Sequence, residues 1–222
     1  MSNYIPAAAS DVYEAENTFY LRSHPSRLAK LLAHYELYRM ISALPGAVVE
    51  MGVYKGASLL RFATFRGIVE NAFSRPVIGF DAFGAFPRSG VEGSADQAFI
   101  EKFEAAGGDG IAKADLEAIA DEKGFANIEL VGGNIFDTLP DWLARQPAQK
   151  IALLHLDMDV YEPTIFALEQ LLPRMVRGGI VVFDDYGLVE GATRAADEMC
   201  AAHGFRMAKL SNYVIPAYFV IP

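Results

Sequence analysis

The sequence has a single cysteine, Cys200, and therefore cannot build a disulfide framework. Because Cys200 lies among alanine and methionine residues at helical spacing, we interpret it as a small buried side chain and not as a nucleophile. Basic residues are also scarce, since 19 Lys and Arg stand against 28 Asp and Glu and the net charge is -9. Nucleic-acid binding depends on clustered cations, so the composition predicts a small-molecule partner and no nucleic acid.

Long apolar runs are absent as well. No run approaches the roughly 18 apolar residues that a membrane helix needs. The N-terminal residues MSNYIPAAASDVYEAE lack a basic segment followed by an apolar one, which is the pattern of a secretory signal. These features predict a cytoplasmic protein with no membrane partner. A length of 222 residues, 52% of them hydrophobic, suits one sizeable globular domain.

From residue 47 onward, apolar runs that predict strands alternate with segments of helical periodicity. The predicted strands span residues 47–52, 76–83, 127–133, 150–157, 178–185, 205–210 and 216–221. Strands that are apolar throughout and separated by helices are typical of a mainly parallel sheet covered on both faces, here a doubly wound, Rossmann-like α/β fold. Only a short segment separates the last two strands, so a final antiparallel hairpin is expected at one edge.

Residues 1–45 form a separate helical segment in this interpretation, ahead of a main domain at residues 46–222. Residues 10–43 are predicted to be helical, with an apolar stripe over residues 28–41. This segment and the loop at residues 82–94 are candidates for a cap or lid over the site. Alternatively, the stripe covers the sheet or joins a homodimer or higher homo-oligomer, and the loop is an ordinary surface loop.

The first predicted strand ends in VVEMGVYKGAS, which places Glu50, Gly52, Tyr54, Gly56 and Ser58 at its carboxyl end. The two glycines permit a tight turn into a helix whose N-terminal amides would face an anionic group. The spacing differs from the G-x-G-x-x-G dinucleotide fingerprint, and the sequence has no Tyr-x-x-x-Lys pair, which argues against an NAD-using oxidoreductase. On these residues alone, a ligand-binding turn and a plain turn both stay open.

Asp81 ends the second predicted strand, and Gly132, Gly133 and Asn134 follow the third. A carboxylate at the end of the second strand accepts both ribose hydroxyls in nucleotide-binding βαβ units. An Asx turn into the following loop is the alternative role for Asp81. The two glycines would leave room for a flat base beside Asn134.

Carboxylates also end the next two predicted strands. Asp157 closes the fourth, and Asp184 and Asp185 close the fifth, with one strand–helix–strand crossover between them. Three like charges that meet at one rim repel each other unless a cation neutralises them, and ligands that are all oxygen suit Mg²⁺. Taken one at a time, each of these aspartates could instead form a turn or cap a helix. Asp159 is predicted to have a supporting or capping role, and His155 to be a packed residue of the strand.

Four motifs, VVEMGVYKGAS, GFDAFGAFP, LHLDMDVYEPT and GGIVVFDDYG, together resemble the TylF/MycF (macrocin O-methyltransferase) family of class I S-adenosylmethionine-dependent methyltransferases. The first motif also resembles that of catechol O-methyltransferase. The similarity extends from about residue 26 to the end, and LDMDVYEPT with DDYG is its specific part. The resemblance implies a seven-stranded sheet with an antiparallel last strand and S-adenosylmethionine as cofactor.

The resemblance also implies roles for individual residues. Glu50, Gly52, Tyr54 and Ser58 would line the methionine half of the cofactor, Asp81 would hold the ribose, Gly133, Asn134 and Ile135 would border the adenine, and Asp157, Asp184 and Asp185 would bind Mg²⁺. Asn134 departs from the acidic residue that many methyltransferases place near the adenine amine. We expect Asp157 to act as both metal ligand and base.

The implied reaction is Mg²⁺-dependent methyl transfer to a hydroxyl of a small molecule, most simply a sugar or a glycosylated metabolite. A catechol-type or other non-sugar acceptor is one alternative. A non-catalytic cofactor-binding domain on the same fold is another, although it would leave three converging carboxylates without a task. The sequence does not identify the acceptor, because fold does not imply substrate.

Overall fold

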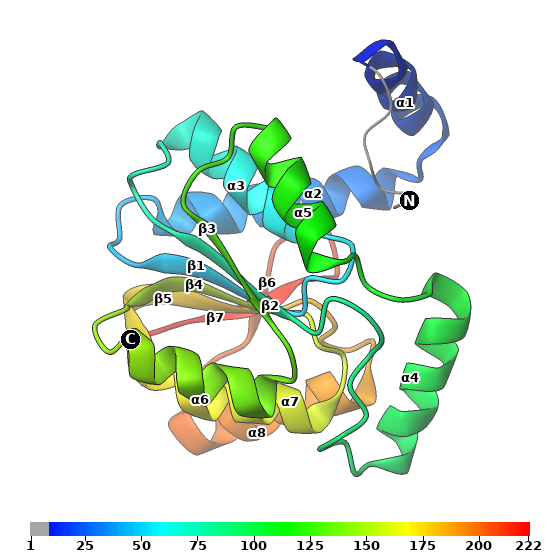
Figure 1. The fold of residues 1–222 in the computed structure, drawn as a ribbon. Helices are drawn as coiled ribbons and strands as arrows, with labels where there is room; N and C mark the ends of the chain where they lie inside the picture. Colours follow the sequence, from blue (N-terminus) through cyan, green and yellow to red (C-terminus); the bar gives the residue numbers. More distant parts are fainter. Residues whose placement is uncertain (1–8) are drawn as a thin grey trace.

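The computed structural model describes residues 9–222, in which seven strands form one twisted sheet (Figure 1). The strands are β1 (Ala47–Met51), β2 (Val77–Asp81), β3 (Ile128–Gly132), β4 (Ile151–Leu156), β5 (Met175–Phe183), β6 (Ala208–Lys209) and β7 (Ala217–Val220). Their order is β3-β2-β1-β4-β5-β7-β6. Strands β1 to β5 are parallel, and β7 runs antiparallel to β5 and β6. The predicted fold and its antiparallel edge hairpin are confirmed.

Helices cover both faces of the sheet (Figure 1). One layer consists of α2 (Pro25–Ile41), α3 (Ala57–Val69) and α5 (Lys113–Glu122), and the other of α6 (Ile135–Arg145), α7 (Tyr161–Leu171) and α8 (Glu190–His203). Helix α4 (Ser94–Gly107) stands beside the carboxyl end of the sheet, and a 3-10 turn (Leu172–Arg174) follows α7. Within residues 9–222, no helix combines the length and the apolar character that crossing a bilayer requires.

Each central strand contributes to two hydrophobic cores, because consecutive side chains of a strand point to opposite faces. Val48 and Ile180 belong to the core under α2, α3 and α5, whereas Val49 and Val181 belong to the core under α6, α7 and α8. Both faces are therefore buried. This double burial explains why the strands are apolar throughout instead of alternating between apolar and polar residues.

The N-terminal segment predicted to be helical consists of two helices. Helix α1 (Ala9–Arg22) ends before Pro25, which occupies the first turn of α2. A residue that precedes proline is driven out of the helical region, and His24 is extended (φ -64°, ψ 142°) while its side chain accepts a hydrogen bond from the Ser26 amide. The break follows from Pro25. Residues 1–8 of the predicted cap lie outside the described residues.

The apolar stripe predicted over residues 28–41 covers the sheet. Its side chains Leu37, Tyr38 and Ile41 are fully buried in the core beneath α2. Helix α1, by contrast, projects away from the body in Figure 1, and its Leu21 side chain is 84% exposed. The two N-terminal helices therefore differ in kind: α2 is part of the packed layer and α1 is not.

A buried ion pair fixes the position of α2 against the sheet. The Arg75 guanidinium donates to both carboxylate oxygens of Glu70, at 2.8 and 2.9 Å, and also to the carbonyls of Ile41 and Gly46, each at 3.1 Å. The Tyr38 hydroxyl donates to the same Glu70 carboxylate. Because this network holds the turn between α2 and β1, it also determines where the other end of α2 reaches the carboxyl end of the sheet.

We predict that Arg75→Met lowers the free energy of unfolding by about 3 kcal/mol, since it leaves the Glu70 carboxylate largely buried without its cation. Urea denaturation of wild type and variant measures the change. Arg39→Met on the exposed face of α2 is the matched control, with an expected change within about 0.5 kcal/mol. A loss below about 1 kcal/mol for Arg75→Met would show that the turn does not depend on this pair.

Candidate functional site

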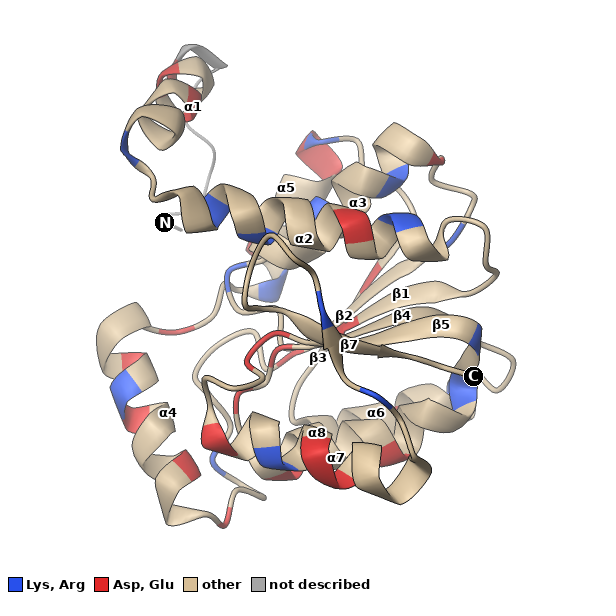
Figure 2. Ribbon diagram, turned by 180° about the vertical axis from the view of Figure 1, so that it is seen from behind, with Lys and Arg blue, Asp and Glu red and all other residues tan. Residues whose placement is uncertain are grey.

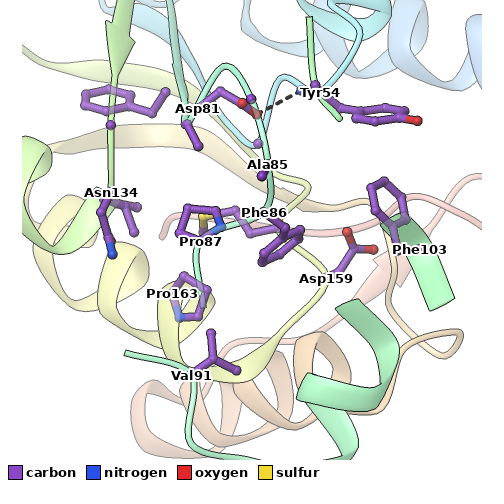
Figure 3. A pocket seen from close by; sticks show the side chains of 18 of the residues that line it. Tyr54, Asp81, Ala85, Phe86, Pro87, Val91, Phe103, Asn134, Asp159 and Pro163 are labelled. Atoms are coloured by element: carbon purple, nitrogen blue, oxygen red, sulfur yellow. Dashed lines mark hydrogen bonds between the residues drawn. The ribbon is translucent and has the colours of Figure 1, made fainter. Parts of the chain in front are cut away.

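A pocket opens at the carboxyl end of the sheet, between the turn after β1, the loop after β2 and the start of α6 (Figure 3). The space not filled by atoms is about 820 Å³, a volume that includes the open mouth of the pocket. The predicted site residues in its lining are Gly52, Tyr54, Asp81, Gly133, Asn134, Ile135 and Asp157. Of the other predicted residues that the structure describes, Glu50, Ser58, Asp184 and Asp185 lie outside this lining.

Apolar side chains form much of the pocket wall. Phe86, Pro87 and Val91 come from the loop after β2, and Phe103 comes from α4 (Figure 3). Part of the loop at residues 82–94 therefore faces the pocket, as a lid would. The wall suits a ligand with flat or apolar parts, and a few polar groups are left to orient it.

The turn after β1 depends on glycine. Gly52 has a φ of +90°, and a Cβ there would lie 1.9 Å from the carbonyl oxygen of Asp157. Gly56, with a φ of +81°, precedes α3, and a Cβ there would lie 2.6 Å from the Leu116 side chain. The predicted tight turn is therefore present, and it brings the ends of β1 and β4 into contact. Ser58 is buried in the first turn of α3.

Tyr54 adopts an uncommon left-handed conformation, with a φ of +50°. Its hydroxyl donates to the Gly107 carbonyl at 2.6 Å, and its ring packs edge-on against Phe103 at a centroid distance of 5.0 Å. Tyr54 thus ties the turn after β1 to the end of α4. Strained backbone is often found at ligand sites, where the surrounding structure maintains it.

Asp81 organises the pocket through the backbone. Its Oδ2 accepts hydrogen bonds from the amides of Val53 and Tyr54 at 2.8 and 2.9 Å, and its Oδ1 accepts from the Phe83 amide at 2.6 Å. Figure 3 shows the bond between Asp81 and Tyr54. The bond to Phe83 is the Asx turn considered as an alternative. A carboxylate offers about four acceptor positions, so a ribose hydroxyl would meet an acceptor that the protein already uses heavily.

Asn134 is likewise engaged by the protein. It caps α6 by accepting a hydrogen bond from the Phe136 amide at 3.1 Å, and its Nδ2 donates to the Ser89 carbonyl at 3.1 Å. The side chain therefore holds the loop after β2 against the start of α6. The adjacent Gly133 has a φ of +131°, and Ile135 lines the pocket beside it. A flat ring placed here would meet backbone and apolar surface more than free polar groups.

The three predicted metal ligands converge. Strands β4 and β5 pair in parallel with Leu156 opposite Phe183, so the next residues, Asp157 and Asp184, leave the sheet side by side. Asp157, Asp184 and Asp185 each offer a carboxylate oxygen, and these oxygens lie within 4.8 Å of one another. Figure 2 shows acidic residues in the loops at this end of the sheet.

Burial and mutual repulsion act strongly on these acids. Burial, together with the charges of Asp184 and Asp185, raises the pKa of Asp157 well above its usual range. Burial and the neighbouring Asp159 and Asp184 raise the pKa of Asp185 to about 8. Asp159 belongs to the same cluster, since burial and the charges of Asp157 and Asp184 raise its pKa to about 7. The protein's own cations therefore leave negative charge in the cluster uncompensated.

Two cations nevertheless reach the cluster. Lys30, from α2, forms an ion pair with Asp184. His155, on β4, contacts Glu50 Oε1 through Nδ1 at 2.9 Å and Asp184 Oδ1 through Nε2 at 3.3 Å. Burial alone would lower the pKa of His155, but these hydrogen bonds raise it to about 10, so the ring is an imidazolium that donates to both carboxylates.

His34, also on α2, is fully buried beside Asp184. Its Nε2 lies 3.5 Å from Asp184 Oδ1, which is too long for a hydrogen bond of good geometry, and burial lowers its pKa to about 4. It is therefore neutral. The sequence analysis did not identify Lys30 or His34 as residues of the site. Their spacing could have indicated it, because they lie i, i+4 within the apolar stripe and so interrupt the face of α2 that packs on the sheet.

Two further groups of side chains have the proximity that a metal site needs, and both contain His155. They are His34 with His155 and Asp184, and Glu50 with His155 and Asp157. Because both ring nitrogens of His155 already contact carboxylates, a metal at either group would have to break one of those bonds. The all-oxygen group of Asp157, Asp184 and Asp185 is the one that adjoins the pocket without this conflict.

Comparison with known proteins identifies the chain's relatives. A family model described as macrocin-O-methyltransferase (TylF) matches residues 25–212. The chain belongs to this family. The resemblance of the four sequence motifs to the TylF family is thereby confirmed.

Two curated relatives from Streptomyces carry methyltransferase names. One, from Streptomyces olivaceus, is 8-demethyl-8-(2,3-dimethoxy-alpha-L-rhamnosyl)-tetracenomycin-C 4'-O-methyltransferase, 31% identical over 67% of this chain and 56% of the relative. The other, demethyldecarbamoylnovobiocin O-methyltransferase of Streptomyces niveus, is 29% identical over 70% of this chain and 58% of the relative. This TylF-family chain thus spans less than two thirds of the length of either relative.

A solved structure of a calicheamicin methyltransferase, CalS11, resembles the whole chain. The TM-score is 0.71 at 27% sequence identity, and the match covers 99% of this chain and 87% of CalS11. A second structure of CalS11 describes it as a TDP-rhamnose 3'-O-methyltransferase. The seven-stranded sheet with its antiparallel edge is therefore shared between this TylF-family member and a solved methyltransferase.

We predict that Gly52→Ala destabilises the protein by more than the roughly 1–2 kcal/mol of a left-handed conformation, because its Cβ would also overlap the Asp157 carbonyl. Gly67→Ala, within α3, has no atom within 4 Å of the new Cβ and should be neutral or slightly stabilising. Urea denaturation compares the two variants. Equal stability of both would contradict the close contact between the ends of β1 and β4.

Proposed function

We propose that this chain transfers a methyl group from S-adenosylmethionine to a hydroxyl of a sugar or glycosylated small molecule, with Mg²⁺ or a similar divalent cation as cofactor. The observation that supports this proposal best is a cluster of three carboxylates, one of which, Asp157, lines a largely apolar pocket in a TylF-family chain. The relatives support the acceptor class, since one is named as a methyltransferase of a rhamnosyl compound and CalS11 is described as acting on TDP-rhamnose.

The proposed cofactor occupies the pocket along the ends of β1, β2 and β3. Its methionine half would lie at Gly52 and Tyr54, near the N-terminal amides of α3. Ser58 would contribute from the first turn of α3, since it is buried outside the pocket lining. Its ribose would face Asp81, and its adenine would lie over Gly133, Asn134 and Ile135. Glu50 would contribute from behind the turn, because its Oε2 is buried and has no hydrogen-bond partner in the described part of the chain.

The residues present fit a hard divalent cation. Asp157, Asp184 and Asp185 supply only oxygen atoms, and Asp185 Oδ2 is buried with no hydrogen-bond partner among the described residues. We propose that these three carboxylates hold the ion. When bound, it would supply the positive charge that lowers the pKa of an acceptor hydroxyl and would relieve the repulsion between the acids.

The proton of the acceptor hydroxyl must go to a carboxylate. We propose Asp157 as metal ligand and base, and the position of Asp159 supports a second candidate for the base. Asp159 points into the pocket between Phe86 and Phe103 (Figure 3), and its pKa near 7 suits a base that works at neutral pH. A carboxylate that already holds a cation is less basic, which favours separating the two roles.

Other expectations about the chain stay proposals. We infer that the loop at residues 82–94 covers the site, since it already faces the pocket. Helix α1 projects away from the body (Figure 1), so a lid that includes it would require the helix to move. The exposed apolar side chains of α1, which include Tyr13 at 72% and Leu21 at 84%, are consistent with a homo-oligomer.

A screen of acceptors tests the proposed function. Nucleotide-linked sugars, glycosylated metabolites and catechols are each incubated with the protein, S-adenosylmethionine and Mg²⁺, and release of S-adenosylhomocysteine is measured. We expect release with a sugar hydroxyl. Release with catechols alone would show that the acceptor is a catechol and not a sugar. No release with any acceptor would favour a non-catalytic binding domain.

Two variants separate the ligand from the base. Asp157→Asn should lose Mn²⁺ binding and turnover together, because it removes a carboxylate from the proposed metal site. Asp159→Asn should keep Mn²⁺ binding and lose about 10²- to 10⁴-fold in kcat if Asp159 takes the proton. Asp141→Asn, exposed on α6, is the control and should match wild type. If Asp157→Asn keeps both metal dependence and turnover, its double role is wrong.

Removal of the metal should abolish turnover and leave cofactor binding detectable. We expect protein treated with EDTA to lose methyl transfer and to regain it with Mg²⁺ or Mn²⁺, while calorimetry detects S-adenosylhomocysteine binding in both conditions. The physical reason is that most of the pocket lining lies apart from the carboxylate cluster. Full turnover in EDTA would rule out metal dependence.

A further inference from the structure

His155 links two neighbouring strands of the sheet through their carboxylates. It pairs with Glu50 of β1 across the sheet, and its Nδ1 lies 2.9 Å from Glu50 Oε1. Its Nε2 lies 3.3 Å from Asp184 Oδ1, just beyond the end of β5. The ring thus spans from the strand that leads into the pocket turn to the strand that leads into the carboxylate cluster.

The ring of His155 has little freedom to turn. The residue is fully buried, and its ring packs edge-on against His34 and Phe62 at centroid distances of 5.2 and 5.4 Å. A rotation that broke one hydrogen bond would leave a buried carboxylate oxygen without its donor, which is costly. Glu50 and Asp184 are therefore linked through the ring, so that a shift of one carboxylate is passed to the other.

At each end of this link, one buried carboxylate oxygen lacks a hydrogen-bond partner in the described part of the chain. Glu50 Oε2 is buried behind the pocket turn and has no hydrogen-bond partner within the described residues. At the other end, Asp184 shares its cluster with Asp185, whose Oδ2 is also buried and without a partner there. A donor near the pocket turn would complete the first end, and a cation would complete the second.

We propose that His155 is a positioning residue that couples the two sites, so that cofactor bound at the pocket turn raises the affinity of the carboxylate cluster for a divalent cation. The proposal rests on the proposed function. A donor on Glu50 fixes that carboxylate, Glu50 fixes the His155 ring, and the ring fixes Asp184 for the cation. Coupling of this kind typically changes an affinity by about 5- to 150-fold, and it is reciprocal between the two ligands.

The test measures metal affinity directly. Mn²⁺ binding is titrated by electron paramagnetic resonance with and without saturating S-adenosylhomocysteine, a readout that does not require turnover. For wild type we expect bound S-adenosylhomocysteine to tighten Mn²⁺ binding by about fivefold or more. His155→Asn places an amide donor near the Nδ1 position and loses the bond to Asp184, whereas His155→Gln places it near Nε2 and loses the bond to Glu50. Each variant should reduce the enhancement to about onefold.

The two variants also differ in an informative way. Without S-adenosylhomocysteine, His155→Gln should bind Mn²⁺ more tightly than His155→Asn, because it keeps the donor on Asp184. Trp142→Phe is the matched control, since Trp142 is also buried and donates to a carboxylate, that of Glu129 at 3.0 Å, but belongs to the opposite core. It should lose stability and keep the full enhancement.

Two results would overturn the coupling. One is a wild type that binds both ligands with no enhancement, and the other is an enhancement that survives in both His155 variants. A loss of enhancement in Trp142→Phe equal to that in the His155 variants would point to general destabilisation instead. Failure of the proposed function is distinguishable, because wild type would then fail to bind Mn²⁺ or S-adenosylhomocysteine, or would bind both and release no S-adenosylhomocysteine with any acceptor in the screen.

Discussion

Buried negative charge at the carboxyl ends of β4 and β5 is the constraint around which the site is built. Parallel register sets Asp157 beside Asp184, and Asp185 follows directly, so repulsion cannot be relieved by moving one strand without breaking the sheet. Two cations partly offset this charge: Lys30 approaches from α2, in the helical layer on one face of the sheet, and His155 lies within the sheet on β4. Each is placed by elements whose own packing is apolar and rigid.

This arrangement depends on distant parts of the fold. Lys30 reaches Asp184 only because α2 packs on the sheet in one position, which the buried pair of Arg75 and Glu70 maintains at the far end of the helix. The contact between Gly52 and the Asp157 carbonyl similarly fixes the end of β4 against the pocket turn. Stability and site geometry are therefore determined by the same contacts.

The sheet could be predicted from the sequence, because strands buried on both faces appear as continuous apolar runs. The convergence of the acids at the strand ends could also be predicted, because parallel strands end at one edge of the sheet. The hydrogen-bond partners of these side chains could not be predicted. Asp81 was predicted as a ribose ligand with an Asx turn as the alternative, and only the coordinates reveal three backbone amides on its carboxylate.

The partners of β4 were missed for a related reason. His155 was predicted to be a packed residue of the strand, and it is buried there. The prediction did not include its hydrogen bonds to Glu50 and Asp184, because these join residues far apart in the chain. Helical and strand periodicity identify which face of an element is buried. They do not identify which polar groups meet across elements, since that depends on the register and spacing of the folded layers.

The charges of the site give the proposed reaction a consistent balance. The site has five carboxylates, those of Glu50, Asp157, Asp159, Asp184 and Asp185. Lys30 contacts Asp184, His155 contacts Asp184 and Glu50, and Arg61 acts on these two acids through its charge. The raised pKa values of several of the five acids mean that the chain alone does not keep all five ionised. The divalent ion and the sulfonium cofactor that we propose would add three positive charges. Methyl transfer removes the sulfonium charge, and the proton leaving the acceptor hydroxyl neutralises one carboxylate. The net charge of the site would therefore stay the same from substrates to products, which is a physical reason for the base to be a member of the cluster.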